Sequence, residues 1–296
     1  MSIIIYNKEY NINLQKLDLQ NKQLISIPLE IYKLSLLQKL DLSYNSIISI
    51  PHEIGILINL QILCLYNNSL ISLPNEIGRL INLQRLILRY NNLITLPESI
   101  ERLVNLQILD LSSNRLTSLP AKIGGLVNLQ KLYLGCNTLS SLPDEFGRLC
   151  LLQDLDLSEN NLISLPAEFS NLRLLQQLDL SYNRLISLPV EFSNLIDLRE
   201  LQLYNNKLHS LPNDFPRLIN LQTLDLHENS YEINNLDMDC EILILASIQN
   251  PITNLPCGLK KIYLKKCINV DMIIKIPFGC EIKYDFDDIL TYAFEE

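Results

Sequence analysis

The sequence predicts an α/β solenoid: a stack of short repeats curved into a horseshoe, with a parallel sheet on the concave face and short helices or helical turns on the convex face. Three observations predict this fold. Leucines recur with a fixed period, apolar residues alternate in the first half of each repeat, and a proline opens each second half. Because such a short repeat cannot bury its apolar face alone, successive repeats must stack on one another.

The period is 23 residues. Repeats start at Leu14, Leu37, Leu60, Leu83, Leu106, Leu129, Leu152, Leu175, Leu198 and Leu221. We expect three regions, namely an N-terminal cap at residues 1–13, regular repeats at residues 14–235, and degenerate repeats with a C-terminal cap at residues 236–296.

The first half of each repeat reads as a short strand. In one repeat Leu109 and Leu111 alternate with Asp110 and Ser112, which places the leucines inward and the polar residues outward. An asparagine then ends the strand segment, and its amide can satisfy backbone groups where the chain turns. This predicts a buried asparagine ladder of Asn45, Asn68, Asn91, Asn114, Asn137, Asn160, Asn183, Asn206 and Asn229.

The second half of each repeat begins at a proline, which sets φ for a turn and cannot donate to a ladder. Apolar residues three apart follow it, as in Ile77 and Leu80 or Phe169 and Leu172, and they predict a short helix or helical turn. The first of these positions changes from isoleucine to phenylalanine at Phe146, which predicts a bulkier spine in the later repeats.

The ends of the array depart from the consensus. Lys22 replaces the ladder asparagine in the first repeat, and the last repeats become degenerate. Two shortened units are visible, and we expect the array to continue through them toward Phe286. Their repeat-like residues are Ile242, Leu245, Asn250, Ile252, Leu255, Pro256, Leu259, Ile262, Leu264 and Cys267.

Composition and charge exclude several classes of protein. A formal net charge of −9 argues against a general binder of nucleic-acid backbones, whose affinity comes from clustered lysine and arginine. No apolar run is long enough to span a membrane and no secretory signal pattern is present, so we expect an intracellular, cytoplasmic protein. Seven cysteines without a CxxC pair favour reduced thiols over a disulfide framework.

The full unit, LxxLxLxxNxLxxLPxxIGxLxNLQ, resembles the 23-residue class of intracellular leucine-rich-repeat proteins, which includes scaffolds of small-GTPase signalling. The resemblance covers roughly residues 14–235. It implies a horseshoe that binds proteins, often through the concave sheet, and no enzymatic activity in the repeats. It does not identify the partner, because the consensus residues are those that build the scaffold.

The candidate partner-binding residues are outward positions of the third to sixth repeats that the scaffold leaves free. The period places Ile62, Arg85 and Ile108 in one row and Tyr66 beside Arg89. Aromatic residues and arginine are enriched in binding hot spots, although single exposed apolar residues also occur on ordinary surfaces. The predicted site comprises Ile62, Tyr66, Arg85, Ile87, Arg89, Tyr90, Ile108, Lys131 and Tyr133.

We expect no catalytic residue, cofactor or metal site. Ser181 and His227 lie two repeats apart, about 10 Å by strand spacing, which is too far for a nucleophile and its base. Cys64 should lie between Asp41 and Ile87, and a carboxylate opposes a thiolate.

The sequence therefore favours a non-enzymatic adaptor that binds a protein, for example a signalling protein, on the concave face. The alternative is recognition of a non-protein ligand, a glycan or a nucleotide, by the same face. A third interpretation, a regulatory ligase subunit or a catalytic C-terminal tail, requires a reactive thiol at Cys257, Cys267 or Cys280.

Overall fold

The computed structural model describes residues 2–5, 8–229, 242–245, 259–264 and 279–283. The chain divides into two compact units, unit 1 (Met1–Asp156) and unit 2 (Leu157–Glu296). The expected boundary at residue 235 lies outside the described residues, as do Asn250, Ile252, Leu255, Pro256, Cys257, Cys267 and Phe286.

Unit 1 begins with an antiparallel hairpin and continues with parallel strands in chain order. The hairpin consists of β1 (Ser2–Ile5) and β2 (Lys8–Asn11). Each later strand pairs with the next one in parallel, one strand per repeat. These strands are β3 (Lys16–Asp18), β4 (Lys39–Asp41), β5 (Ile62–Cys64), β6 (Arg85–Ile87), β7 (Ile108–Asp110), β8 (Lys131–Tyr133) and β9 (Asp154–Asp156).

Unit 2 repeats the same parallel order. Its strands are β10 (Gln177–Asp179), β11 (Glu200–Gln202), β12 (Thr223–Asp225), β13 (Ile242–Leu245), β14 (Lys261–Leu264) and β15 (Glu281–Lys283). The last three strands continue the parallel pairing, although the sequence there no longer follows the consensus.

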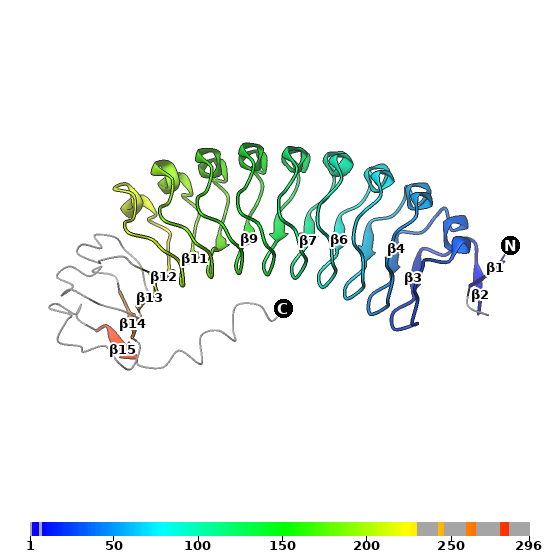
Figure 1. Ribbon diagram of the computed structural model, residues 1–296, viewed down its shortest axis with the longest axis horizontal. Coiled ribbons are helices and arrows are strands. Elements are labelled where there is room, and N and C mark those ends of the chain that lie inside the picture. The colour runs from blue at the N-terminus through cyan, green and yellow to red at the C-terminus, as the bar shows by residue number, and fades with distance from the viewer. Residues whose placement is uncertain (1, 6–7, 230–241, 246–258, 265–278, 284–296) are drawn as a thin grey trace. The chain divides into compact units, whose positions relative to one another are not determined.

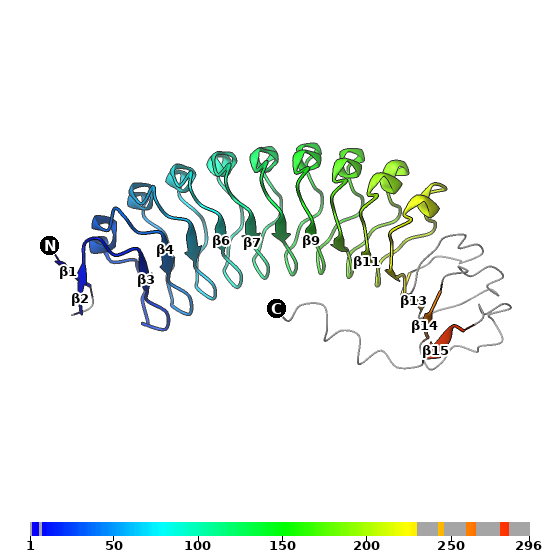
Figure 2. The ribbon, with the colours of Figure 1, turned by 180° about the vertical axis from the view of Figure 1, so that it is seen from behind.

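Short 3-10 helices occupy the second half of the repeats. In each unit they lie on the side opposite the strands (Figures 1 and 2). Unit 1 holds η1 (Leu29–Lys33), η2 (His52–Ile56), η3 (Asn75–Arg79), η4 (Glu98–Arg102), η5 (Ala121–Gly125) and η6 (Asp144–Arg148). Unit 2 holds η7 (Ala167–Asn171), η8 (Val190–Asn194) and η9 (Phe215–Arg217). The predicted solenoid of parallel strands and helical turns is confirmed, and the turns are of the 3-10 type.

In the repeats that have both a strand and a 3-10 helix, buried apolar side chains fill the space between the two elements. In the repeat of β7 the buried residues are Leu106, Leu109, Leu111, Leu116, Leu119, Ile123 and Leu126. The spine beneath the 3-10 helices is aliphatic from Ile31 to Ile123 and aromatic from Phe146 onward. In unit 2 the rings of Phe169, Phe192 and Phe215 stack in parallel, with centroids 6.4 and 6.2 Å apart.

Asparagine side chains join the repeats where the strands end. The Asn114 Nδ2 group donates to the carbonyls of Leu111 in its own repeat and Leu88 in the preceding one, at 2.9 and 3.0 Å. Its Oδ1 accepts from the amide of Leu93 at 3.0 Å. The same bonds to own and preceding repeats recur at Asn68, Asn91, Asn137, Asn183, Asn206 and Asn229. Because these amides are mostly buried, each satisfies backbone groups that water cannot reach.

The residue before each ladder asparagine adopts a left-handed backbone, with φ between 50 and 57°. This conformation is uncommon outside glycine, and here it recurs once per repeat. It directs the side chain at that position out beside the strand face. The residues are Tyr44, Asn67, Tyr90, Ser113, Cys136, Glu159, Tyr182, Asn205 and Glu228.

Candidate interaction surfaces

The strand face of unit 1 carries the predicted site residues in the predicted register. Ile62 pairs with Arg85, and Arg85 pairs with Ile108, so the three form one row. Arg85 is exposed and the two isoleucines are half-buried, because the long arginine side chain extends between shorter neighbours.

Three tyrosines from successive repeats form a contiguous cluster on unit 1, which we call the tyrosine cluster: Tyr44, Tyr66 and Tyr90. The ring of Tyr66 meets those of Tyr44 and Tyr90 edge to face, with centroid distances of 5.0 and 5.5 Å. Such edge-to-face pairs are the geometry that aromatic quadrupoles favour. Tyr44 was not predicted from the sequence. The signal for it was its position, since Tyr44 and Tyr90 both precede a ladder asparagine.

Arg89 adds a cation to the tyrosine cluster. Its Cζ atom lies 5.0 Å from the ring centroid of Tyr90, and its Nη2 atom donates to the Tyr90 hydroxyl at 3.4 Å. Burial lowers the pKa of this guanidinium, but the hydrogen bond to Tyr90 and the nearby Asp110 outweigh that effect and raise it. Arg89 was expected beside Tyr66, and the register agrees, since the amide of Asn67 donates to the Arg89 carbonyl at 2.9 Å. The guanidinium also interacts electrostatically with Tyr66, and its ring contact is with its chain neighbour Tyr90.

Lys131 and Tyr133 belong to a separate polar network on β8 and β9. The Tyr133 hydroxyl donates to Asp154 Oδ2 at 2.6 Å, and Lys131 Nζ lies 3.5 Å from the same oxygen. Burial and the Asp154 carboxylate raise the pKa of Tyr133. Tyr133 is therefore held by a short hydrogen bond to an acid of the next strand, whereas the Tyr90 hydroxyl accepts a longer one from Arg89.

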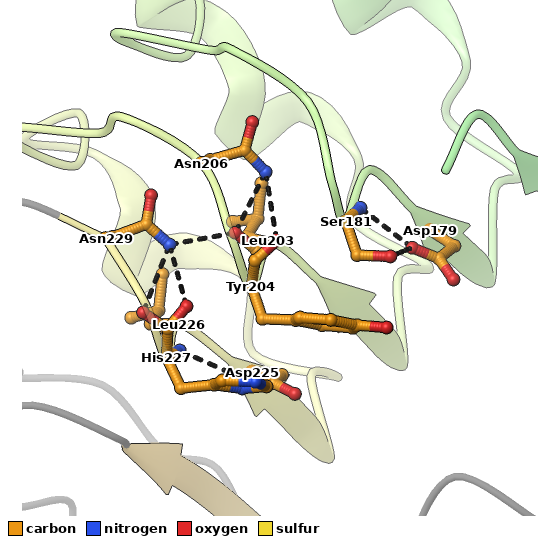
Figure 3. Close-up of polar contacts among 9 residues, drawn as sticks. All are labelled: Asp179, Ser181, Leu203, Tyr204, Asn206, Asp225, Leu226, His227 and Asn229. Carbon is orange, nitrogen blue, oxygen red and sulfur yellow. Dashed lines mark hydrogen bonds and ion pairs between the residues drawn. The ribbon is translucent and has the colours of Figure 1, made fainter. Parts of the chain in front are cut away.

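Unit 2 carries a second aromatic group, which we call the unit 2 stack: Tyr182, Tyr204 and His227. The His227 ring lies parallel to that of Tyr204 at a centroid distance of 4.4 Å, and Tyr182 meets Tyr204 edge to face at 4.8 Å. His227 Nδ1 contacts Asp225 Oδ1 closely, and Figure 3 shows the rings of Tyr204 and His227 side by side. Burial raises the pKa of Asp225, although the bond from His227 opposes that shift.

Ser181 and His227 are each bound to an aspartate of their own repeat. The Ser181 hydroxyl donates to Asp179 Oδ1 at 2.5 Å, whereas His227 is bound to Asp225. Tyr204, which follows β11, lies in the repeat between them (Figure 3). This agrees with the separation expected from the repeat spacing.

Two cysteine thiols of the described part of the chain, Cys64 and Cys280, have a raised pKa. Cys64 lies between Asp41 and Ile87, as the register predicted. Burial, and then the carboxylate of Asp41, raises its pKa to about 11. Burial also raises the pKa of Cys280, with Glu281 adding to the effect. Because thiolates are the reactive species, neither residue is activated as a nucleophile.

A second set of asparagines, which sequence reasoning missed, lies on the exposed edge before β5, β6, β7, β8 and β12. The Nδ2 atoms of its members donate to carbonyls of the preceding repeat at 2.7–2.9 Å. Its members are Asn59, Asn82, Asn105, Asn128 and Asn220. The signal was the asparagine of the recurring LxNLQ segment.

The described residues include no helix of the length and apolarity that a membrane span requires. Within the same part of the chain, no three histidine, cysteine, aspartate or glutamate side chains gather in a way that could hold a metal ion.

Comparisons with known proteins agree with the repeat architecture. The sequence matches the family description "Leucine-rich repeat region" over residues 75–160. It matches "Leucine Rich Repeat" over residues 36–57, 151–172, 174–195 and 197–218. A search of curated protein sequences returns no match.

Three solved structures illustrate the range of similar proteins. A leucine-rich-repeat protein of Leptospira interrogans is 32% identical, with a TM-score of 0.73 over 92% of this chain and 74% of its own. The ectodomain of the Arabidopsis thaliana membrane receptor kinase GASSHO1/SCHENGEN3, in complex with CASPARIAN STRIP INTEGRITY FACTOR 2, is 28% identical, with a TM-score of 0.72 over 91% of this chain and 38% of that one. An internalin of Listeria monocytogenes is 19% identical and shares the fold, with a TM-score of 0.68 over 93% of this chain and 88% of its own.

Proposed function

Because this chain belongs to the leucine-rich-repeat family, we propose that it is a protein-binding module that holds its partner on the strand face of unit 1. The observation that carries the proposal is the tyrosine cluster with Arg89. The scaffold does not require aromatic or cationic residues at these positions, since the same repeat positions hold serine, asparagine or glycine elsewhere.

The accessibility of the cluster supports this assignment. Tyr44 and Tyr90 are 48% and 44% exposed. Tyrosine and arginine supply large contact areas in binding hot spots, and apolar neighbours exclude water around them. Here Ile62, Ile87 and Ile108 are such neighbours, and with Arg85 and Arg89 they make the core of the proposed surface.

Lys131 and Tyr133 are proposed as the rim of this surface, because both are already held by Asp154. We further propose an intracellular location, where thiols stay reduced. Cys64, Cys150 and Cys280 are free thiols. The interpretation as a ligase subunit or catalytic tail requires a reactive thiol, and the raised pKa of Cys280 disfavours its thiolate.

Affinity capture from cell lysate tests the proposal. The bait is the full chain, beside a Tyr66→Ala/Arg89→Glu variant and a control, Arg79→Glu/Arg102→Glu, whose substitutions lie on exposed positions of η3 and η4. We expect a partner protein captured by the wild type and the control and lost by the first variant. With purified partner, the first variant should raise Kd about tenfold or more.

Folding of each variant is checked by circular dichroism. Equal capture by all three baits would show that the strand face of unit 1 is not the binding surface. A captured glycan or nucleotide without protein would favour the alternative ligand class on the same face.

A further inference from the structure

Tyr90 of unit 1 and Tyr182 of unit 2 occupy the same position of their repeats. Each precedes a ladder asparagine, each has a left-handed backbone, with φ of 56 and 50°, and they are 44% and 46% exposed. In unit 1 the guanidinium of Arg89 covers the Tyr90 ring at 5.0 Å. Unit 1 thus shows how a guanidinium sits on a tyrosine at this position.

At the corresponding place in unit 2, the described residues supply no cation. Ser181 stands where Arg89 stands in unit 1, and it is a small buried residue bound to Asp179. Across the described residues, no lysine or arginine lies over the ring of Tyr182, whereas Arg89 does lie over that of Tyr90. The outer part of the Tyr182 ring is therefore open to a ligand.

Carboxylates surround this position. Asp179 stands where unit 1 has Ile87, and exposed Glu159 lies on the adjacent repeat, its amide donating to the Ser181 carbonyl at 3.0 Å. Between β10 and the last ladder asparagine, the third, fifth, seventh and eighth positions of the unit 2 repeats include four acids and no lysine or arginine, whereas Arg184, Arg199 and Lys207 are exposed at other positions of these repeats. The third, fifth, seventh and eighth positions are Gln177, Asp179, Ser181, Tyr182, Glu200, Gln202, Tyr204, Asn205, Thr223, Asp225, His227 and Glu228.

We propose that unit 2 binds an arginine side chain of a partner polypeptide, with the guanidinium over the ring of Tyr182 and paired with the carboxylate of Glu159. Arginine fits better than lysine, because its planar group stacks on an aromatic face while its N–H groups meet a carboxylate. The remaining acids of the strand face attract a basic segment and exclude an acidic one. This surface is separate from the one proposed for unit 1, and its test does not depend on that proposal.

Peptide binding to the full chain tests the inference. The probe is a fluorescein-labelled, acetylated and amidated peptide with two arginines in a glycine–serine background, and binding is followed by fluorescence anisotropy. Matched peptides carry lysine or the neutral isostere citrulline in place of arginine. We expect the arginine peptide to bind about threefold or more tightly than the lysine peptide, and the citrulline peptide not to bind.

Substitutions then locate the site. Tyr182→Ala should weaken the arginine peptide about fivefold to tenfold, and Glu159→Gln about threefold. The controls are Ile186→Ala, of similar exposure in the same repeat, and Glu191→Gln on η8, and both should bind as the wild type does. Ser181→Arg should weaken binding as well, because the new side chain would cover Tyr182 as Arg89 covers Tyr90.

Three results would overturn the proposal: no binding of the arginine peptide up to about 1 mM, equal binding of the arginine and lysine peptides, or an unchanged affinity in folded Tyr182→Ala. Equal weakening by Glu191→Gln and Glu159→Gln would also overturn it, since that pattern indicates general attraction by net charge. Circular dichroism of each variant separates loss of the site from loss of folding.

Discussion

Unit 1 and unit 2 share one hydrogen-bonding scaffold and differ at the positions that the scaffold leaves open. Ladder asparagines make the same bonds in both, as Asn114 and Asn206 show. The spine of unit 1 is mostly isoleucine and that of unit 2 is phenylalanine. At the third, fifth, seventh and eighth positions of the repeats, unit 1 mixes cations with acids, whereas unit 2 between β10 and β12 carries acids without lysine or arginine.

This contrast separates stability from recognition. The backbone geometry is set by a few repeated residues, so side chains elsewhere in the repeat are free to change charge and size. The two units therefore present different chemistry on the same spacing, and substitutions should act on one property at a time.

The largest expected effect concerns the spine. Phe192→Ala should lower the free energy of unfolding by roughly 3–5 kcal/mol, because it removes a fully buried ring that stacks on Phe169 and Phe215. Urea unfolding followed by circular dichroism measures the loss. Ile100→Val in unit 1 is the mild comparison, at roughly 0.5–1.5 kcal/mol. If the two variants unfold at the same urea concentration, the aromatic spine adds nothing to unit 2.

The next effect tests whether the scaffold is the same in both units. Asn114→Ala and Asn206→Ala should each cost roughly 1–3 kcal/mol, because each leaves buried backbone groups without partners. Asn105→Ala is the matched control, since its exposed side chain makes one bond, to the Ile81 carbonyl, and should cost less than about 1 kcal/mol. An unchanged unfolding midpoint in Asn114→Ala and Asn206→Ala would show that the asparagine ladder does not contribute to stability.

A smaller effect distinguishes residues within the strand face of unit 1. Tyr133→Phe should cost about 1 kcal/mol, because it removes the hydrogen bond from the hydroxyl to Asp154. Tyr90→Phe should cost less than about 0.5 kcal/mol, since its ring is 44% exposed. The two values come from the same urea titration. The opposite order would mean that Tyr90, and not Tyr133, is committed to the fold.

The repeat explains how much of this could be predicted from the sequence. The strands, the parallel order and the row of Ile62, Arg85 and Ile108 follow from a period of 23 residues, because register is fixed by counting. The tyrosine contacts do not follow from counting. Tyr44 and Tyr90 sit at left-handed turn residues, so their rings leave the alternation of the strand and reach sideways to Tyr66.

The sequence predicts a helical turn after each proline but does not show whether it is an α-helical or a 3-10 turn. Only a few residues separate each proline from the next buried leucine, as between Pro97 and Leu103, and such a short segment closes as a tight 3-10 helix. Apolar residues three apart are compatible with both helix types, so the pattern alone does not choose between them.

The smallest effect is kinetic and concerns Cys64 of unit 1. Its raised pKa of about 11, caused first by burial and then by Asp41, leaves about one thiolate in a thousand at pH 8. Iodoacetamide labelling, followed peptide by peptide with mass spectrometry, should therefore be at least about tenfold slower at Cys64 than at exposed Cys150. The rate at Cys64 should rise about tenfold per pH unit from pH 8 to pH 10, because the thiolate fraction rises in that proportion below the pKa. Asp41→Asn should speed the reaction by removing the opposing charge but not the burial, and a rate that levels off near pH 8 would show that Cys64 ionises readily and is open to nucleophilic chemistry.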